Sequence, residues 1–580
     1  MIFHKSISNL VRITGVILIT GLLFGTLPAL SASAAADLYV ATTGTDSGNC
    51  PSSDPCATVN YAITKSVSGD IIHIAAGTYH EHIYVTQSVT ISGDGMDQTI
   101  LDGSSSHRVL AVSSPYTVSI NDLTIQNGYV ASDNGAGIRN QGTLNLTRVK
   151  ITNNTALQGA GLSTSEPFTI VDSVISNNNA NIDSTGRGGG IWIYDSGSAS
   201  ISNTTISGNT STEYGGGIFV TGSSTVLSMT NVTISGNTSK NGGGMTITIG
   251  ATVNVVNSTI AGNHLSVGTY GGGFSNFATI NFKNSILADN DIPNCGNAGG
   301  SLTSQGYNLD SADSCGFTST GDLINTDPQL GALGNNGGLT QTHALPAGSP
   351  AIDAGTNTDC PSTDQRGVSR PLDGDANDSS ICDMGAYELK PNIISTYYST
   401  GLYDGWILES TENSTVGGTK DSTSTVFRLG DDASDKQYRA ILSFNTASLP
   451  DNAIFKKITL KIKKQGLTGL NPFSGFNGLK VDIRKPYFGT TGSLVTGDFQ
   501  AAAGKSAIAT FGATPVSNWY SASIGSTSYS YINKTGTTQF RLRFYLGDND
   551  NASADYMKFF SGNYTTVAAR PTLIIEYNTP

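Results

Sequence analysis

Two cations and one carboxylate recur near runs of glycine in the middle of the chain. Arg187 directly precedes one run of three glycines, while Glu213 and Lys240 lie two residues before the next two runs. A base that removes the proton beside a uronate carboxylate, with a cation to neutralise that carboxylate, would cleave an acidic polysaccharide by elimination. If the protein is an enzyme, we therefore expect a polysaccharide lyase that uses Lys240, Glu213 or Arg187.

Aromatic residues in the same part of the chain indicate a different chemistry. Trp192, Tyr194 and Phe219 alternate with isoleucine and valine, so they point outward if the aliphatic side chains point inward. Tyr214 and Tyr270 directly precede glycine runs. Because aromatic rings stack on sugar rings, these five residues predict a glycan-binding surface. The competing interpretation is that a loop covers the rings and that Glu213 and Lys240 form a solvated ion pair.

Other signs of catalysis are weak. The sequence contains no G-x-S-x-G, H-E-x-x-H or P-loop motif. Residues 135–290 carry only six Asp and Glu and six Lys and Arg, a small supply for a site that needs an acid, a base and metal ligands. Glycan recognition or adhesion is therefore the favoured function. The alternative is a polysaccharide lyase or glycoside hydrolase that cleaves an acidic polysaccharide.

One acidic segment has the spacing of a calcium loop. Asp373, Asp375 and Asn377 place side-chain oxygen atoms at alternate positions. The glycine and glutamate that complete an EF-hand loop are missing, and the same residue types are common in polar turns. We consider Ca²⁺ as an optional ligand of this segment and expect that no cofactor is required.

Two repeated phrases must position these side chains. Glycine-rich phrases begin at residues 135, 159, 188, 215, 242 and 271, in steps of 24, 29, 27, 27 and 29 residues. A second phrase ends each unit on an asparagine: Asn154, Asn178, Asn209, Asn237, Asn263 and Asn290. Such a period indicates stacked supersecondary units, and the β-branched, glycine-rich composition favours coils of short strands over helices.

Stacked coils determine which residues become neighbours. Their backbones hydrogen-bond to one another about 4.8 Å apart, and inward aliphatic side chains form continuous rows. We expect the asparagines to form an internal ladder of side-chain amides. In such a stack Trp192 lies beside Phe219, and Glu213 lies beside Lys240. The predicted fold is all-β, with a right-handed parallel β-helix as its main body.

The N-terminus predicts export. Lys5 and Arg12 precede an apolar run over residues 13–30, and Ala32-Ser33-Ala34 has the small residues of a cleavage site. Residues 1–36 are therefore interpreted as a signal peptide rather than a membrane anchor. We expect a mature chain without a transmembrane segment, secreted or associated with the cell surface.

Cysteines and charge agree with an extracellular protein. The six cysteines arrive in three local pairs, which favours the disulfides Cys50–Cys56, Cys295–Cys315 and Cys360–Cys382, although the sequence alone does not exclude other pairings. The net charge of −12 argues against a nucleic-acid partner, because phosphate-binding surfaces need a basic excess. We expect a monomer whose partner is a polysaccharide or a cell-surface glycan.

Several motifs resemble known families. The segment Gly69-Asp-Ile-Ile-His-Ile-Ala-Ala-Gly-Thr-Tyr-His-Glu81 resembles the opening of pectin-lyase-like β-helix proteins, and the repeats resemble those of polymorphic outer-membrane-protein-type surface β-helices. The phrases Ala347-Gly-Ser-Pro-Ala-Ile-Asp-Ala-Gly355 and Cys382-Asp-Met-Gly-Ala-Tyr-Glu388 resemble the choice-of-anchor Q region that closes many such proteins. The resemblance implies a fold for residues 37–390 but no particular activity.

The composition of the sequence changes after Pro391, where the asparagine-rich repeats stop and Lys, Arg, Phe and Tyr become more frequent. Alternating segments such as Arg439–Asn445 and Phe540–Tyr545 predict an antiparallel β-sandwich of jelly-roll type. Residues 396–578 resemble the DNRLRE, or disaggregatase-related, module, which is similar to a family of carbohydrate-binding modules. The predicted organisation is a signal peptide (1–36), a β-helix (37–345), a choice-of-anchor Q-like closing segment (346–391) and a DNRLRE-like sandwich (396–580).

Overall fold

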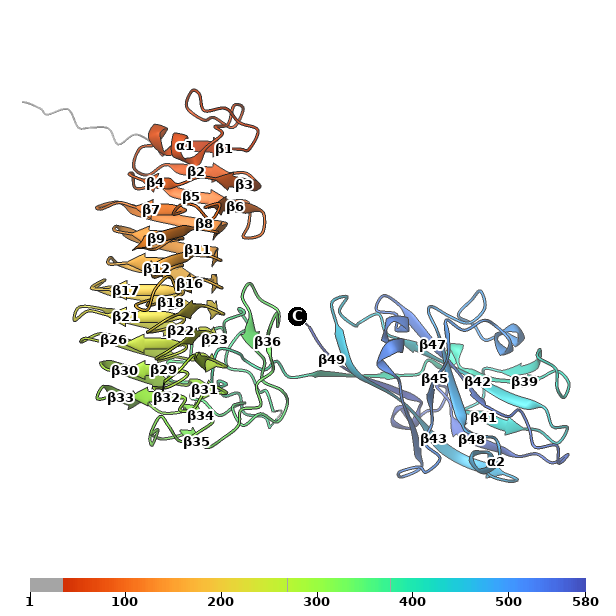
Figure 1. The fold of residues 1–580 in the computed structure, drawn as a ribbon. Helices are drawn as coiled ribbons and strands as arrows, with labels where there is room; N and C mark the ends of the chain where they lie inside the picture. The colour runs from red at the N-terminus through yellow and green to blue at the C-terminus, as the bar shows by residue number, and fades with distance from the viewer. Residues whose placement is uncertain (1–34, 269, 376, 580) are drawn as a thin grey trace, which may run out of the picture.

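The computed structural model describes residues 35–268, 270–375 and 377–579. The predicted signal peptide therefore lies almost wholly outside the described residues. The described chain is all-β, with a column of stacked coils followed by an antiparallel module (Figure 1). In the described residues, no helix is both long and apolar enough to traverse a bilayer.

The coils stack through parallel sheets that run along the column (Figure 1). One sheet has the strand order β32-β29-β25-β21-β17-β13-β10-β7-β4, so each neighbour comes from the next winding of the chain. The bounds of its strands are β4 Ile83–Val85, β7 Leu110–Val112, β10 Ile138–Asn140, β13 Leu162–Thr164, β17 Ile191–Tyr194, β21 Ile218–Thr221, β25 Met245–Ile247, β29 Phe274–Asn276 and β32 Cys295–Asn297.

Two further parallel sheets complete the coils. The smaller one contains β9 Tyr129–Asn134, β12 Thr155–Gln158, β16 Asn179–Ala180, β20 Thr210–Ser211, β24 Thr238–Ser239 and β28 His264–Leu265. The larger one contains β1 Asp37–Val40, β2 Ile71–Ile74, β3 Gly77–His80, β5 Thr90–Gly93, β6 Thr99–Asp102, β8 Thr117–Gln126, β11 Thr143–Thr152, β14 Phe168–Val171, β15 Val174–Ser176, β18 Ser198–Ser202, β19 Thr205–Ser207, β22 Val226–Thr230, β23 Thr233–Ser235, β26 Thr252–Val256, β27 Thr259–Ala261, β30 Thr279–Lys283, β31 Ile286–Ala288, β33 Ser301–Ser304, β34 Leu309–Asp310 and β35 Leu323–Ile324.

The expected asparagine ladder is present inside the stack. The side-chain amide of Asn209 donates to Oδ1 of Asn237 at 2.9 Å, and the side-chain amide of Asn237 donates to Oδ1 of Asn263 at 2.9 Å. All six predicted asparagines join this column, which continues through Asn294 to Asp310. Every rung is buried, so the ladder satisfies polar groups that no water reaches.

Glycine is required where the coils turn. Gly215 has a φ of +59°, which disfavours residues with a Cβ. A Cβ on Gly217 would lie 2.6 Å from the carbonyl oxygen of Gly244 in the next coil and 3.2 Å from atoms of the Asn237 side chain. The glycine runs therefore bring successive backbones and the ladder close together.

A short helix covers the N-terminal end of the stack. This helix, α1, spans Val59–Lys65. Its N-cap Thr58 accepts a hydrogen bond from the Tyr61 amide. Val59, Ala62 and Ile63 of this helix are buried in the core of the coils, so the helix closes an otherwise open end.

Residues 325–390 fold back along the side of the column, beside the strands of the later coils (Figure 1). This segment contains β36 Leu333–Gly334 and β37 Thr342–His343. Gln365 is buried against the coils, where its amide donates to Oγ1 of Thr205 at 3.0 Å and its Oε1 accepts from Oγ1 of Thr233 at 2.6 Å. The structure forms the three expected disulfides, Cys50–Cys56, Cys295–Cys315 and Cys360–Cys382.

The C-terminal module is a curled antiparallel sandwich. Its strands are β38 Ile393–Tyr398, β39 Gly405–Glu409, β40 Gly417–Asp421, β41 Val426–Asp431, β42 Gln437–Asn445, β43 Ile454–Thr468, β44 Leu479–Arg484, β45 Lys505–Thr510, β46 Trp519–Ser523, β47 Thr537–Phe544, β48 Tyr556–Phe560 and β49 Thr572–Asn578. The short helical turns are α2 Pro472–Gly475, η1 Gly401–Tyr403, η2 Thr496–Phe499, η3 Ser526–Tyr531 and η4 Val567–Ala569. Most of its buried aliphatic and aromatic side chains form one core, and a second, smaller cluster contains Ile407, Ile441, Phe488, Leu494 and Phe499.

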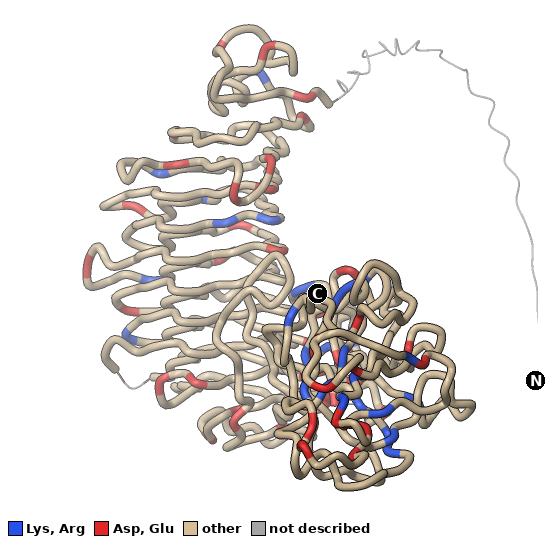
Figure 2. The backbone as a smooth tube through the Cα atoms, turned by 90° about the vertical axis from the view of Figure 1, so that its right-hand side faces the viewer, with Lys and Arg blue, Asp and Glu red and all other residues tan. Residues whose placement is uncertain are grey.

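The two parts of the molecule differ in charge. Residues 391–580 carry 18 Lys and Arg against 14 Asp and Glu, whereas residues 1–390 carry 13 against 29. Figure 2 shows the basic residues gathered in the sandwich and thinly spread over the coils. A polyanionic partner would therefore meet a more favourable potential at the sandwich than at the coils.

Candidate functional site

The coil register brings together residues far apart in sequence. In the parallel pair β17 and β21, Trp192 lies opposite Phe219 and Tyr194 lies opposite Thr221. Arg187 and Tyr214, which each directly precede a glycine run, are also paired in parallel between adjacent coils. Arg187, Trp192, Tyr214 and Phe219 therefore lie on neighbouring coils of the column.

Arg187 is the centre of this group of side chains. Its guanidinium carbon lies 5.6 Å from the ring centroid of Tyr214 and 5.7 Å from that of Phe219. Its Nη2 lies 3.6 Å from Oε2 of Glu213. We call Arg187, Glu213, Tyr214 and Phe219 the Arg187 cluster.

The structure differs from the sequence analysis in two details of this cluster: the exposure of the Phe219 ring and the ion-pair partner of Glu213. Phe219 is only 4 % exposed, because Tyr214 stacks near it with ring centroids 5.8 Å apart and Arg187 lies over its ring. Glu213 pairs with Arg187, whereas Lys240 is exposed and joins no ion pair among the described residues. The coil register still places Lys240 beside Glu213, since Tyr214 pairs with Asn241 in adjacent coils, but the Glu213 carboxylate is paired with Arg187.

Trp192 and Tyr194 extend the surface beside the cluster. Both side chains are half-buried, and their ring centroids lie 4.4 Å apart. Nε1 of Trp192 and Nε of Arg187 are buried atoms that have no hydrogen-bond partner among the described residues. Unpaired buried donors are rare in folded proteins, so each of these two atoms needs an explanation. Tyr270 is more exposed and stacks instead near Phe277, with ring centroids 5.7 Å apart.

A polar groove on another face of the coils was not found from the sequence. Its volume is about 560 Å³, and one end carries an ion pair between Lys150 and Asp97 at 3.6 Å. The remaining walls come from successive coils and from the fold-back segment: Met96, Gln126, Thr152, Asn153, Val174, Ser176, Asn177, Ser207, Leu339 and Gln341. Because the fold-back segment supplies one wall, the repeats alone could not reveal it.

The acidic segment near residue 375 differs from the expected calcium loop. Asp373 and Asp375 do come together, but their third carboxylate neighbour is Asp353, and ligand atoms of the three lie within 4.8 Å of one another. Asn377 instead donates its side-chain amide to Oδ2 of Asp375 at 2.9 Å. Asp353 precedes the other two by some twenty residues, so local spacing gave no sign of it.

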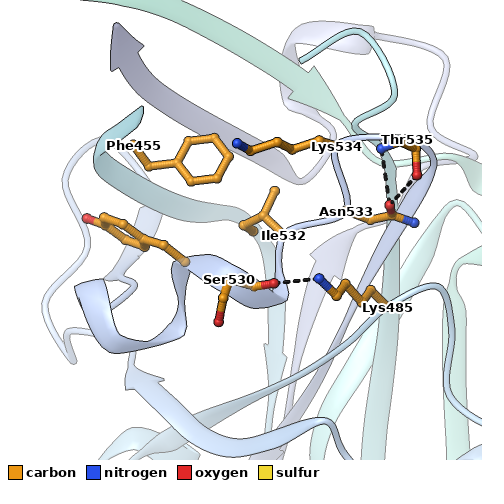
Figure 3. Close-up of a pocket in the computed structure, with 8 residues that line it drawn as sticks. Phe455, Lys485, Ser530, Ile532, Asn533, Lys534 and Thr535 are labelled. Carbon is orange, nitrogen blue, oxygen red and sulfur yellow. Dashed lines mark hydrogen bonds between the residues drawn. The ribbon is translucent and has the colours of Figure 1, made fainter. Parts of the chain in front are cut away.

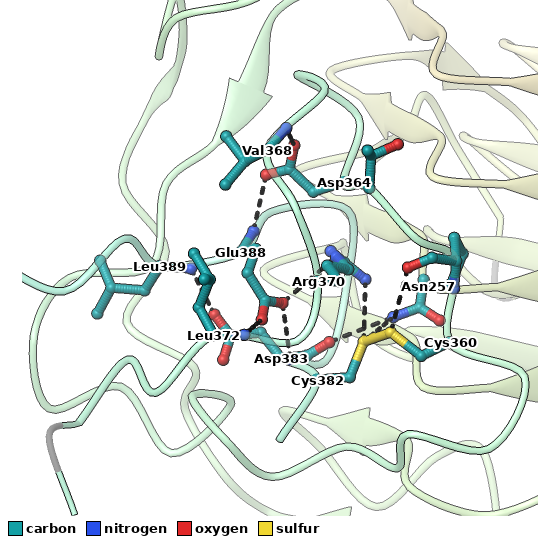
Figure 4. Close-up of polar contacts among 12 residues, drawn as sticks. Asn257, Cys360, Asp364, Val368, Arg370, Leu372, Cys382, Asp383, Glu388 and Leu389 are labelled. Atoms are coloured by element: carbon teal, nitrogen blue, oxygen red, sulfur yellow. Dashed lines mark hydrogen bonds and ion pairs between the residues drawn. A yellow bond between two sulfur atoms is a disulfide. The ribbon is translucent and has the colours of Figure 1, made fainter. Parts of the chain in front are cut away.

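A buried polar network holds the fold-back segment together (Figure 4). Nε of Arg370 lies 3.3 Å from Oε2 of Glu388, and both side chains are fully buried. Burial and the neighbouring Glu388 carboxylate raise the pKa of Asp383 to about 8. Arg370, Asp383 and Glu388 are all buried, so their effect is on the stability of the segment.

A hollow of about 390 Å³ lies at one end of the sandwich (Figure 3). Phe455 and Ile532 form its apolar side, and in this view Lys534 lies above and Lys485 below. Nζ of Lys485 donates to the Ser530 carbonyl at 2.6 Å, and Nζ of Lys534 donates to the Asp451 and Ala453 carbonyls. Both ammonium groups therefore serve to fix loops.

Comparison with known protein families gives a match within the stacked coils. Residues 108–284 match the family model described as right handed beta helix region. The coils form a right-handed parallel β-helix. No curated protein matches the chain.

Two solved structures are similar to this β-helix protein. A pectate lyase, Pel9A, is 16 % identical with a TM-score of 0.35, over 62 % of this chain and 97 % of that one. XylC in complex with xylose is 10 % identical with a TM-score of 0.30, over 61 % of this chain and 98 % of that one. At such values neither likeness bears on activity.

Proposed function

We propose that the protein is an extracellular glycan-binding protein whose β-helix holds polysaccharide at the Arg187 cluster and the adjoining Trp192 and Tyr194. Export is supported by the N-terminal sequence and by the three disulfides, which persist in oxidising compartments. The resemblance of residues 396–578 to a DNRLRE module supports a sandwich that also recognises glycans.

The observation that carries this proposal is a pair of unpartnered donors, one in the Trp192 ring and one in the Arg187 guanidinium, on a surface that carries aromatic side chains. Nε1 of Trp192 and Nε of Arg187 are desolvated without a partner, while the rings of Trp192, Tyr194 and Tyr214 are half-exposed beside them. A sugar provides what such a site lacks, because its ring faces stack on aromatic side chains and its hydroxyl groups accept hydrogen bonds.

The test is retention of the purified protein on immobilised polysaccharides. We expect Trp192→Ala and Tyr214→Ala each to weaken retention on a polysaccharide that the unaltered protein binds, by roughly tenfold, as expected for loss of a stacking contact with its hydrogen bond. Tyr129→Ala is the matched control, because Tyr129 is an exposed tyrosine in β9 on another sheet of the coils. Equal retention of all three variants would refute the assignment.

A second candidate function is cleavage of an acidic polysaccharide in the polar groove. Its support is the groove of about 560 Å³, whose wall carries Lys150, an amine that pairs with the exposed Asp97 at 3.6 Å. An elimination would raise ultraviolet absorbance through new unsaturated ends during incubation with polygalacturonate. Arg187 and Glu213 are paired with each other, so the lyase role considered for them is less well supported than binding.

A further inference from the structure

Two neighbouring strands of the sandwich present cations on the side away from the core. In β41, the buried Phe427 and Leu429 alternate with a half-buried Arg428. In β48, the half-buried Tyr556 and Lys558 alternate in the same way with buried side chains. The period of two thus sorts these strands into an apolar inner face and a cationic, aromatic outer face.

Arg428 is enclosed by three aromatic rings from three other strands. Its guanidinium carbon lies 5.2 Å from the ring centroid of Trp406, 5.6 Å from that of Tyr438 and 5.1 Å from that of Tyr556. Its Nη1 donates to the hydroxyl oxygen of Tyr438 at 3.2 Å. We call Arg428, Trp406, Tyr438 and Tyr556 the Arg428 cage.

Among the described residues no carboxylate lies within ion-pair distance of the cage cations, and the Arg428 charge acts on Asp421 only at longer range. Arg428 lies directly opposite Lys558 in the antiparallel register, and neither forms an ion pair with any described residue. Nε of Arg428 is buried without a hydrogen-bond partner in the described structure. Like charges that face each other across strands destabilise a sheet. An anionic ligand bound between Arg428 and Lys558 would offset this repulsion.

Another arginine pair in the same sandwich shows the contrast. Arg541 and Arg543 share the buried carboxylate of Asp482, at 2.9 Å and 3.2 Å. At this position the buried carboxylate of Asp482 neutralises the charge of two adjacent arginines. At the cage, two cations and an unpaired donor lie beside aromatic rings.

We propose that the Arg428 cage, with Lys558, is a binding site for an anionic polysaccharide. Carboxylate or sulfate groups bind the guanidinium and ammonium groups, and a sugar ring packs against Trp406 and Tyr556. The proposal rests on the proposed function in that both sites bind polysaccharide, but the two sites share no residue. The basic excess of residues 391–580 supports an anionic ligand.

The test measures binding of the full exported chain to soluble polymers. All proteins carry Trp192→Ala and Tyr214→Ala, so that the β-helix surface contributes little. Affinity electrophoresis compares polygalacturonate, dextran sulfate and neutral dextran, which separates carboxylate, sulfate and uncharged ligands. We expect binding to at least one anionic polymer and none to dextran, with affinity falling as salt is added.

Charge removal then locates the site. Arg428→Gln and Lys558→Gln should each reduce affinity for the anionic polymer by roughly tenfold, since each removes a charge-assisted hydrogen bond. Arg484→Gln is the matched control, because Arg484 is a surface arginine of β44 that donates only to the Ala502 carbonyl at 3.4 Å. Affinity unchanged by the first two substitutions, or equal binding of dextran, would overturn the proposal.

A second readout does not depend on folding of the charge variants. The chain has three tryptophans, and with Trp192→Phe and Trp519→Phe only Trp406 remains. Addition of the anionic polymer should then shift the Trp406 emission, whereas dextran should not. An unchanged spectrum at saturating polymer would place the ligand elsewhere. Retention on polysaccharide that Trp192→Ala and Tyr214→Ala leave unchanged, together with an intact Trp406 response, would instead count against the proposed function alone.

Discussion

Asn209 and Asn237 are joined through their side chains, with the amide nitrogen of Asn209 2.9 Å from Oδ1 of Asn237, although 28 residues separate them. Oδ1 of Asn237 also accepts the backbone amide of Asn209 at 3.0 Å. One side chain thus holds both the backbone and the side chain of the previous coil. The ladder therefore fixes the register on which the whole outer surface depends.

Loss of one rung should be costly. Asn237→Leu leaves the backbone amide of Asn209 buried without an acceptor. It also removes one of the two acceptors of the Asn209 side-chain amide, which still donates to the Ile175 carbonyl, and each unsatisfied group costs about 1–3 kcal/mol. We expect the free energy of unfolding to fall by about 3 kcal/mol or more in chemical denaturation. Asn145→Leu is the control, because Asn145 lies on an outer face and accepts only from Thr169. Similar losses in both variants would contradict a special role for the ladder.

The fold-back segment should loosen when Gln365 is shortened. Gln365→Ala removes hydrogen bonds to Thr205 and Thr233 on the coils and leaves a small cavity at a buried position. We expect faster cleavage of residues 325–390 in limited proteolysis and a loss of about 2–3 kcal/mol in stability. The exposed Gln329 offers a matched substitution in the same segment, Gln329→Ala, which should leave the cleavage pattern unchanged.

Stability of the sandwich should depend on pH through Asp404. Burial raises the pKa of this carboxyl to about 7, although the amides of Ser443 and Gly562 donate to it. Because the folded pKa is raised, the stabilisation is fully present below the unfolded pKa near 4 and is lost as pH rises through about 7. The slope is at most about 1.4 kcal/mol per pH unit for one group.

Thermal unfolding between pH 5 and pH 8 tests this dependence. The Asp404→Asn variant cannot ionise, so its midpoint should fall less over that range than the midpoint of the unaltered protein. Burial also raises the pKa of Asp431 to about 7, which leaves part of the slope in the variant. Parallel pH profiles for the two proteins would show that Asp404 ionises normally in the fold.

The ion pair between Arg187 and Glu213 should affect how strongly the protein binds an anionic ligand, and it should have little effect on the stability of the fold. Glu213→Gln removes the carboxylate 3.6 Å from Arg187, and a partly exposed pair contributes at most about 1 kcal/mol to folding. We therefore expect little change in the unfolding midpoint and several-fold stronger retention on polygalacturonate. Glu166→Gln, a change at another acidic residue of the coils, controls for net charge. Weaker retention after Glu213→Gln would mean that the carboxylate itself contacts the ligand.

The repeat made the β-helix and much of its outer register predictable. Phrases that recur every 24 to 29 residues can bury their aliphatic side chains only by stacking, so the alignment of phrases is also the alignment of coils. This is why Trp192 and Phe219 could be placed side by side from the sequence. Local spacing likewise suggested the disulfides, since each pair closes a short loop.

Side-chain pairing and the path of the non-repeating segments were decided only by the tertiary structure. Arg187 pairs with Glu213, and Phe219 becomes buried, because long side chains lie across the surface in directions that coil alignment does not specify. The Arg428 cage draws on four strands that are not consecutive in the chain, and Asp353 meets Asp375 through a fold-back. Periodicity reports which neighbours the backbone hydrogen bonds create, whereas these contacts follow from packing in three dimensions.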